Sequence, residues 1–298
     1  MLIFGINLNK REYLNFERIE KKMFFLIQEE NNELSLDNII LLDLIKEEKY
    51  LHNYEIIKND DFFDRNENNE KILKKKEVFP IKYQEAIPLG TIEFTQNYFK
   101  IFYEIEKENP IEIPPILRTD EFLKRKYSIV TYNKIPKEGY YFIKDVSQLK
   151  VFSYDGDMRF FVRDDEKYKS KYSLTLNKKH LYQVSEHVKI LSEYRIFVIN
   201  NEIYSINNYD GDVCLFPDIT LIKKAITLWS FQPNCPKSYS LDVAITPQGT
   251  MILECHILFS TGIYSTIQGT KLLWGYQDAK DYLVNYNTQI EEFSNFKK

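Results

Sequence analysis

Two acidic side chains, Asp242 and Glu254, lie in neighbouring strand-like segments in the last quarter of the sequence. Residues 240–246 and 250–258 are rich in β-branched and apolar types, and Pro247-Gln248-Gly249 joins them. Three loop residues that end in glycine are typical of a hairpin built on a type I turn followed by a left-handed residue. The pattern therefore predicts that the two carboxylates meet across an antiparallel pair of strands.

The length of the loop sets the expected register of this hairpin. It places Thr246 opposite Thr250. Counting outward from that pair puts Asp242 opposite Glu254. Side chains alternate between the two faces of a strand, so His256 is expected on the same face as the carboxylates. The other face is expected to be apolar core, formed by Leu241, Val243, Ile245, Met251, Leu253 and Cys255.

Facing carboxylates need a positive partner, because like charges directly opposite each other destabilise a sheet. Magnesium is the natural candidate, since it prefers oxygen ligands and takes one or two carboxylates together with water and substrate phosphates. The alternative is a solvated sheet face on which the carboxylates pair with nearby lysines. The residues alone leave both interpretations open.

Basic side chains in three other segments could serve a phosphate site. Glu193 and Arg195 are two residues apart in a strand and point the same way, shortly after Glu186 on the preceding strand. Arginine offers a planar fork suited to phosphate or carboxylate, although Glu-x-Arg on a strand is most often a surface ion pair. Lys144 lies in the strand-like run FIKDV, and Lys150 follows a short turn. A lysine at the edge of a sheet that extends into water is the alternative for Lys144.

The elements that must position these residues change along the chain. Apolar spacing predicts helices over residues 11–30, 37–48 and 276–292, and residues 59–77 are expected to form a solvated loop or an exposed helix. Short runs of β-branched and aromatic residues predict antiparallel strands in the second half. These runs are residues 139–146, 180–188, 193–199, 202–207, 240–246 and 250–258. Asn200-Asn201 has the spacing of a two-residue hairpin turn.

Composition excludes several classes of protein. The 298 residues carry 40 basic and 44 acidic side chains, so no global positive charge attracts nucleic acid. None of the 9 glycines has the spacing of a dinucleotide-binding fingerprint or a P-loop. Three separated cysteines indicate neither a disulfide framework nor a structural zinc site. With no signal peptide and no membrane-spanning run, we expect a cytoplasmic protein without membrane partners.

Read in order, these pieces resemble the ATP-grasp superfamily. The phrases FIKD, SEYRIFV, YSLDVAIT and ILECHILFSTGIY, together with PLGTIEFTQNYF, are similar to its phage and bacterial branch, and the likeness covers about residues 86–278. The resemblance implies an α+β fold in which two lobes clasp ATP. It places an N-terminal α/β domain over residues 1–115, lobe 1 over 116–186 and lobe 2, with a C-terminal helix, over 187–298.

The resemblance also implies a role for each candidate residue. Lys144 would contact the phosphates and adenine of ATP, helped at the phosphates by Lys150. Glu186, His187 and Val188 would form the hinge that meets the adenine edge, and Glu193 would hold the ribose. Arg195 would face the transferred phosphate or the substrate. Magnesium would be bound by Asp242 and Glu254, with His256 standing where the family usually has asparagine.

The implied activity is that of an ATP-dependent carboxylate–amine ligase that works through an acyl phosphate. Its partner would be a small molecule or peptide that supplies a carboxylate and an amine. Two alternatives remain open. One is a nucleotide-binding interaction protein that keeps the fold without turnover, suggested by His256. The other is a structural protein whose likeness to the family is accidental.

Overall fold

The computed structural model describes residues 22–105, 113–147, 153–158, 176–264 and 269–295. The chain divides into two compact units. Unit 1 comprises Met1–Glu104 and Gln268–Leu273, and unit 2 comprises Ile105–Ile267 and Trp274–Lys298. Each unit is considered by itself, because each has its own sheets.

Unit 1 is built on a parallel sheet of strand order β2-β1-β5, which gives it an α/β character. Its helices and strands are β1 (Met23–Glu29), α2 (Leu36–Glu47), β2 (His52–Lys58), β3 (Phe63–Arg65), β4 (Lys71–Leu73), α3 (Ile81–Glu85), β5 (Ile87–Leu89) and α4 (Ile92–Tyr103). The helix predicted over residues 11–30 is wrong where the structure describes that range, since β1 occupies it. Phe25, Leu26 and Ile27 are fully buried. A strand covered on both faces is continuously apolar, and its spacing can imitate a helix.

The helix predicted over residues 37–48 is confirmed as α2, which begins after Ser35. The Ser35 hydroxyl accepts a hydrogen bond from the Asn38 backbone N–H at 3.2 Å, so an otherwise orphaned donor is satisfied. The charged stretch at residues 59–77, expected to form a loop or helix, instead contains the β3–β4 hairpin. These two short strands pair antiparallel.

Unit 2 contains two antiparallel four-stranded sheets, each of which anchors a lobe. Lobe 1 has strand order β6-β9-β7-β8, and lobe 2 has order β11-β10-β12-β13. Their elements are α5 (Asp120–Leu123), β6 (Tyr127–Thr131), β7 (Tyr140–Asp145), β8 (Ser153–Asp157), β9 (Leu181–Glu186), β10 (Ser192–Ile199), β11 (Glu202–Gly211), α6 (Ile219–Ser230), β12 (Tyr239–Thr246), β13 (Gly249–His256) and α7 (Lys271–Asn295). All six strands predicted in this half are confirmed, as is the C-terminal helix. Helix α6 is not among the predicted elements.

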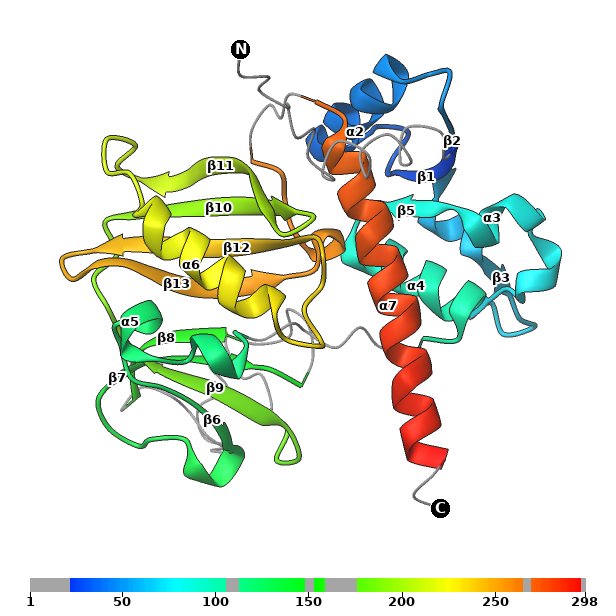
Figure 1. The fold of residues 1–298 in the computed structure, drawn as a ribbon. Coiled ribbons are helices and arrows are strands. Elements are labelled where there is room, and N and C mark those ends of the chain that lie inside the picture. The colour runs from blue at the N-terminus through cyan, green and yellow to red at the C-terminus, as the bar shows by residue number, and fades with distance from the viewer. Residues whose placement is uncertain (1–21, 106–112, 148–152, 159–175, 265–268, 296–298) are drawn as a thin grey trace, which may run out of the picture. The chain divides into compact units, whose positions relative to one another are not determined.

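Each sheet of unit 2 buries one face. In lobe 1, Ile143 of β7 and the β9 residues Tyr182 and Val184 belong to the core. In lobe 2, helix α6 lies across one face of the sheet (Figure 1), where Trp229 packs on Tyr239 with ring centroids 4.3 Å apart. The opposite face of each sheet is therefore available for function.

The two-residue turn predicted between β10 and β11 is confirmed. Ile199 pairs with Glu202, and Asn200 and Asn201 have φ angles of 54° and 60°. Asparagine tolerates this left-handed conformation better than most residues do. Within the described residues, no helix is long and apolar enough to span a membrane.

Candidate functional site

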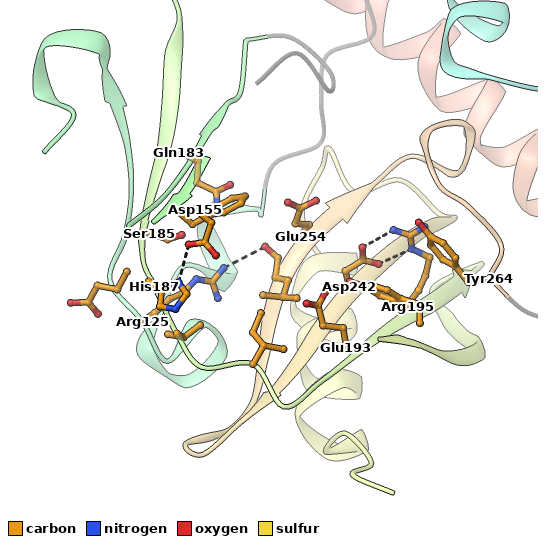
Figure 2. Close-up of a pocket in the computed structure, with 16 residues that line it drawn as sticks. Arg125, Asp155, Gln183, Ser185, His187, Glu193, Arg195, Asp242, Glu254 and Tyr264 are labelled. Carbon is orange, nitrogen blue, oxygen red and sulfur yellow. Dashed lines mark hydrogen bonds and ion pairs between the residues drawn. The ribbon is translucent and has the colours of Figure 1, made fainter. Parts of the chain in front are cut away.

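A pocket of about 390 Å³ lies inside unit 2, between residues of lobe 1 and residues of lobe 2 (Figure 2). This volume is within the range of small-molecule sites, about 300–1,000 Å³. Sixteen residues line it: Arg125, Phe142, Asp155, Gln183, Ser185, Glu186, His187, Val188, Ile190, Glu193, Arg195, Tyr209, Asp242, Leu253, Glu254 and Tyr264. Most of the residues predicted from the sequence to form the site are among them.

The predicted pairing of Asp242 with Glu254 is confirmed, but the route to it differs. Thr246 pairs with Gly249 and not with Thr250, so the loop is one residue shorter than predicted. A β-bulge between Asp242 and Val243 then shifts the register by one residue. The two errors in counting cancel, and the carboxylates face each other.

The bulge also changes which side chains of β13 face the core. Leu253, predicted on the core face, instead lines the pocket beside Glu254. Ile252 takes the core position, opposite Val243. A bulge aims two successive side chains at one face, which strict alternation from the sequence cannot anticipate.

Arg125 holds the backbone at this bulge. Its guanidinium donates to the carbonyl oxygens of Ile252 at 2.8 Å and Leu253 at 3.4 Å, and contacts the Met251 sulfur at 3.3 Å. The Arg125 side chain is 8% exposed, and its burial lowers the pKa of the guanidinium from its usual range. A lobe 1 residue thus fixes the strand that carries Glu254.

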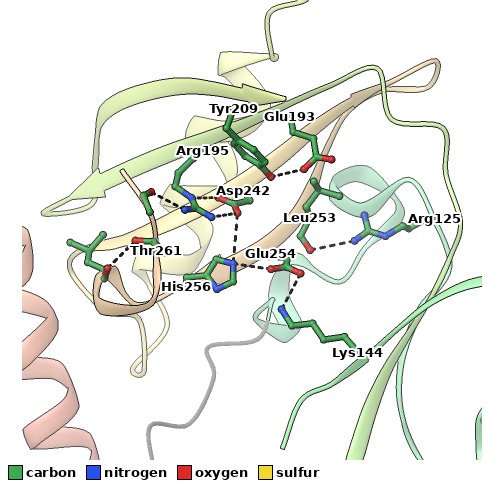
Figure 3. A network of polar contacts seen from close by, with 12 residues as sticks. Arg125, Lys144, Glu193, Arg195, Tyr209, Asp242, Leu253, Glu254, His256 and Thr261 are labelled. Carbon is green, nitrogen blue, oxygen red and sulfur yellow. Dashed lines mark hydrogen bonds and ion pairs between the residues drawn. The ribbon is translucent and has the colours of Figure 1, made fainter. Parts of the chain in front are cut away.

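Arg195 and Asp242 form a buried two-pronged ion pair (Figure 3). Arg195 Nε donates to Oδ1 at 2.8 Å and Nη2 donates to Oδ2 at 2.7 Å. Nη1 donates to the carbonyl oxygen of Gly262 at 2.9 Å. Burial disfavours the charged guanidinium, but the Asp242 carboxylate outweighs it and raises the pKa of Arg195. Arg195 therefore stays charged and orients Asp242.

Glu254 is held by two other basic side chains. Lys144 Nζ lies 2.9 Å from Oε1, and His256 Nε2 lies 2.8 Å from Oε2. Burial by itself raises the pKa of Glu254, but the hydrogen bond to His256 and the charge of Lys144 lower it to about 2. Glu254 is therefore ionised across the neutral range.

Asp242, Glu254 and His256 offer ligand atoms that all lie within 4.8 Å of one another. His256 Nε2 is also 3.7 Å from Asp242 Oδ2. Two carboxylates suit a hard cation such as magnesium, whereas an imidazole nitrogen is a less usual neighbour for it. The donor set fits magnesium through its two carboxylates.

The far side of the pocket carries an aromatic pair. Tyr209 donates its hydroxyl to Glu193 Oε2 at 2.5 Å, and its ring stacks on Tyr264 with centroids 5.3 Å apart. The Arg195 guanidinium lies 5.6 Å from the Tyr209 centroid and 4.8 Å from the Tyr264 centroid. Burial raises the pKa of Glu193, which the Tyr209 hydrogen bond partly offsets.

The segment predicted as a hinge follows β9 and borders the pocket. Glu186 Oε2 accepts a hydrogen bond from the Lys126 backbone N–H at 3.0 Å, and this contact holds the pKa of Glu186 below its usual range. His187 Nδ1 lies 2.8 Å from Asp155 Oδ1. Val188 lines the pocket next to them.

The remaining predicted residues lie at different distances from the pocket. Lys144 and His256 contact Glu254 but do not line the cavity. Lys150 lies outside the described residues. Sequence reasoning missed Gln183 and Ser185, although alternation along LYQVSE puts them opposite the buried Tyr182 and Val184 and could have identified them.

Three solved structures resemble the chain at low sequence identity. They are the macrocyclase MdnC of Microcystis aeruginosa bound with the precursor peptide MdnA (11% identity, 88% of this chain and 100% of that chain covered, TM-score 0.44), a D-alanine–D-alanine ligase of Bacillus anthracis (10%, 92% and 99%, 0.45) and the D-cycloserine synthetase DcsG (10%, 87% and 99%, 0.48). No match was found among curated proteins.

A family model that describes an ATP-grasp domain, the second family of its clade, matches residues 122–271, which is half of the chain. The match spans both four-stranded sheets and every predicted site residue from Lys144 to His256. The α+β fold expected from the resemblance is confirmed. The chain belongs to this family of ATP-grasp domain proteins.

Proposed function

We propose that the protein is an ATP-dependent ligase that joins a carboxylate to an amine through an acyl phosphate. The observation that carries the proposal is the direct pairing of Asp242 with Glu254 at the edge of a pocket between two lobes. Lys144 and Arg195 contact these carboxylates from opposite sides. Two acids and two bases around one cavity match what a metal-bound triphosphate requires.

The nucleotide would lie in the pocket with its base toward the hinge. Glu186, His187 and Val188 border that end, and Glu193 is placed to accept from a ribose hydroxyl once the nucleotide competes with Tyr209. Lys144 would leave Glu254 for the phosphates, since both sites are anionic, and Lys150 would support it. Asp242 and Glu254 would hold magnesium, which when bound supplies Lewis-acid stabilisation of charge on the phosphoryl oxygens.

The chain's own residues would promote two steps. In the first, the bond between the γ-phosphorus and the ADP oxygen breaks as a carboxylate oxygen of the acid bonds to phosphorus. Lys144 and Arg195 would stabilise the negative charge on the transferred group. In the second, the amine nitrogen attacks the acyl carbon, inorganic phosphate leaves and the nitrogen loses a proton. The protein supplies positioning and charge, and no covalent enzyme intermediate is needed.

Hydroxylamine trapping tests this proposal without knowledge of the amine. The full chain is incubated with magnesium, ATP and pools of carboxylic acids, and hydroxamate is measured together with ADP. We expect hydroxamate and ADP in equal amounts from at least one pool, and at least tenfold less from Asp242→Asn. Asp43→Asn, on the exposed face of α2, is the matched control. ADP release that never yields hydroxamate with any acid would contradict the ligase proposal.

A second candidate function is nucleotide binding without turnover. The contact that favours it is that of His256 with Glu254, because imidazole occupies an oxygen that magnesium would use. If this candidate holds, His256→Asn gains ATP consumption that the wild type lacks. Substantial ATP consumption by the wild type, unchanged in His256→Asn, excludes it.

A further inference from the structure

Two polar side chains in the pocket wall are buried and have no partner. Gln183 is 5% exposed and Ser185 is 2% exposed, and both line the cavity. Among the described residues, neither side chain takes part in a hydrogen bond or ion pair. Burying an amide or hydroxyl without a hydrogen bond is costly, so such groups are normally satisfied. Their unmet hydrogen bonds point to a polar ligand in the cavity.

The register of the lobe 1 sheet fixes where these groups lie. On β7, Lys144 pairs with Gln183 and Phe142 pairs with Ser185. The hinge begins at the next residue, Glu186. Gln183 and Ser185 thus form a row that runs from the hinge toward Lys144, and Figure 2 shows both on the lobe 1 side of the pocket.

Apolar side chains flank this row. Phe142 lies in lobe 1, Leu253 lies in lobe 2, and Val188 and Ile190 line the connection between them. Apolar groups on facing walls suit the two faces of a planar heteroaromatic ring, whereas the polar row suits its hydrogen-bonding edge. A purine base has both features.

We infer that Gln183, with Ser185 beside it, reads the edge of the nucleotide base and selects adenine over guanine. This inference rests on the proposed binding of ATP in the pocket. A glutamine amide offers one acceptor and one donor side by side. It can accept from N6–H and donate to N7 of adenine at once. Guanine presents two acceptors there, O6 and N7, so the amide oxygen faces an acceptor in either orientation.

Calorimetric titration of the full chain with magnesium and three nucleotides tests this assignment. The nucleotides are ADP, GDP and 7-deaza-ADP, which lacks the N7 acceptor and keeps the N6 amino group. We expect the wild type to bind ADP roughly 10- to 100-fold more tightly than GDP, the discrimination typical of a bidentate amide contact. We also expect wild type to bind 7-deaza-ADP more weakly than ADP.

Gln183→Leu should bind ADP and 7-deaza-ADP equally and lose most of its preference over GDP. The exposed Gln232→Leu is the matched control and should behave as wild type. Because leucine removes an unsatisfied buried amide, Gln183→Leu should unfold at an equal or higher temperature without ligand. A merely structural glutamine would show the opposite, a lower unfolding temperature with an unchanged preference among the nucleotides.

The outcomes separate the two proposals. If the wild type binds ADP and Gln183→Leu keeps the wild-type ratios of ADP to GDP and to 7-deaza-ADP, the role of Gln183 is overturned and the proposed function stands. Equal binding of ADP and 7-deaza-ADP by the wild type overturns the N7 contact. If no nucleotide binds the wild type, both proposals fail.

Discussion

Both carboxylate oxygens of Asp242 accept hydrogen bonds from the guanidinium of Arg195, at 2.8 and 2.7 Å. The two residues are 4% and 7% exposed and face each other across β12 and β10. A third donor of Arg195 reaches the Gly262 carbonyl, so the same side chain ties down the loop after β13. The pair therefore links the proposed metal-binding acid to the segment that carries Tyr264.

Removing Arg195 should strongly destabilise unit 2. Arg195→Met leaves Asp242 buried without a countercharge, and we expect the free energy of unfolding to fall by about 3–5 kcal/mol. Urea denaturation followed by circular dichroism measures it. Lys223→Met, on the exposed side of α6, should change little. A loss as small as that of the control would show that the fork is not needed for the fold.

Arg125 should matter through the bulge that it holds. Arg125→Met removes hydrogen bonds from a charged donor to the Ile252 and Leu253 carbonyls, and we expect a loss of about 1.5–3 kcal/mol in the free energy of unfolding. The affinity for magnesium–ATP should fall with it, because the bulge aims Glu254. The exposed Lys134→Met serves as the control. Unchanged stability would contradict this role.

Lys144 should affect binding more than folding. Its ion pair with Glu254 is partly exposed, at 23% and 28%, so Lys144→Met should change the free energy of unfolding by less than about 1 kcal/mol. The affinity for magnesium–ATP should fall about tenfold or more, the effect of losing one charge-assisted hydrogen bond to phosphate. Calorimetry and urea unfolding on the same samples compare the two effects. A variant that unfolds easily yet binds ATP normally would reverse the assignment.

The turn between β10 and β11 offers a test of the fold alone. Asn200 has φ = 54°, and a β-branched residue is strained in this conformation. We expect Asn200→Val to lower the free energy of unfolding by about 1–2 kcal/mol. Asn201→Gly, in the same turn, should be neutral or stabilising, since Asn-Gly favours this turn type. Equal stability of the two variants would argue against the left-handed turn.

Much of unit 2 could be predicted from its sequence because its strands carry local signals. Alternating apolar residues and the Asn200-Asn201 turn were enough to give β10, β11 and the pairing of Asp242 with Glu254. What failed was the detail that depends on non-local contacts. The bulge at Leu253 is held by Arg125, which is far away in sequence, so no local pattern reveals it.

Unit 1 was harder for a related reason. The residues of β1 are apolar at almost every position because the strand is buried on both faces, and such a run fits a helix or a strand equally well. Gln183 was overlooked because a polar residue in a strand is ordinary. Its significance comes from burial and the lack of a partner among the described residues, which only the structure gives.

The most direct test of the central claim is a thermal shift with magnesium–ATP on the wild type and on Glu254→Gln. Glu121→Gln, at an exposed ion pair with Lys224, is the matched control. ATP at about 100 times its dissociation constant should stabilise the wild type and the control by roughly 2.7 kcal/mol. Glu254→Gln should lose most of that gain. No shift in the wild type, or an equal shift in Glu254→Gln, would contradict an ATP and metal site at Asp242 and Glu254.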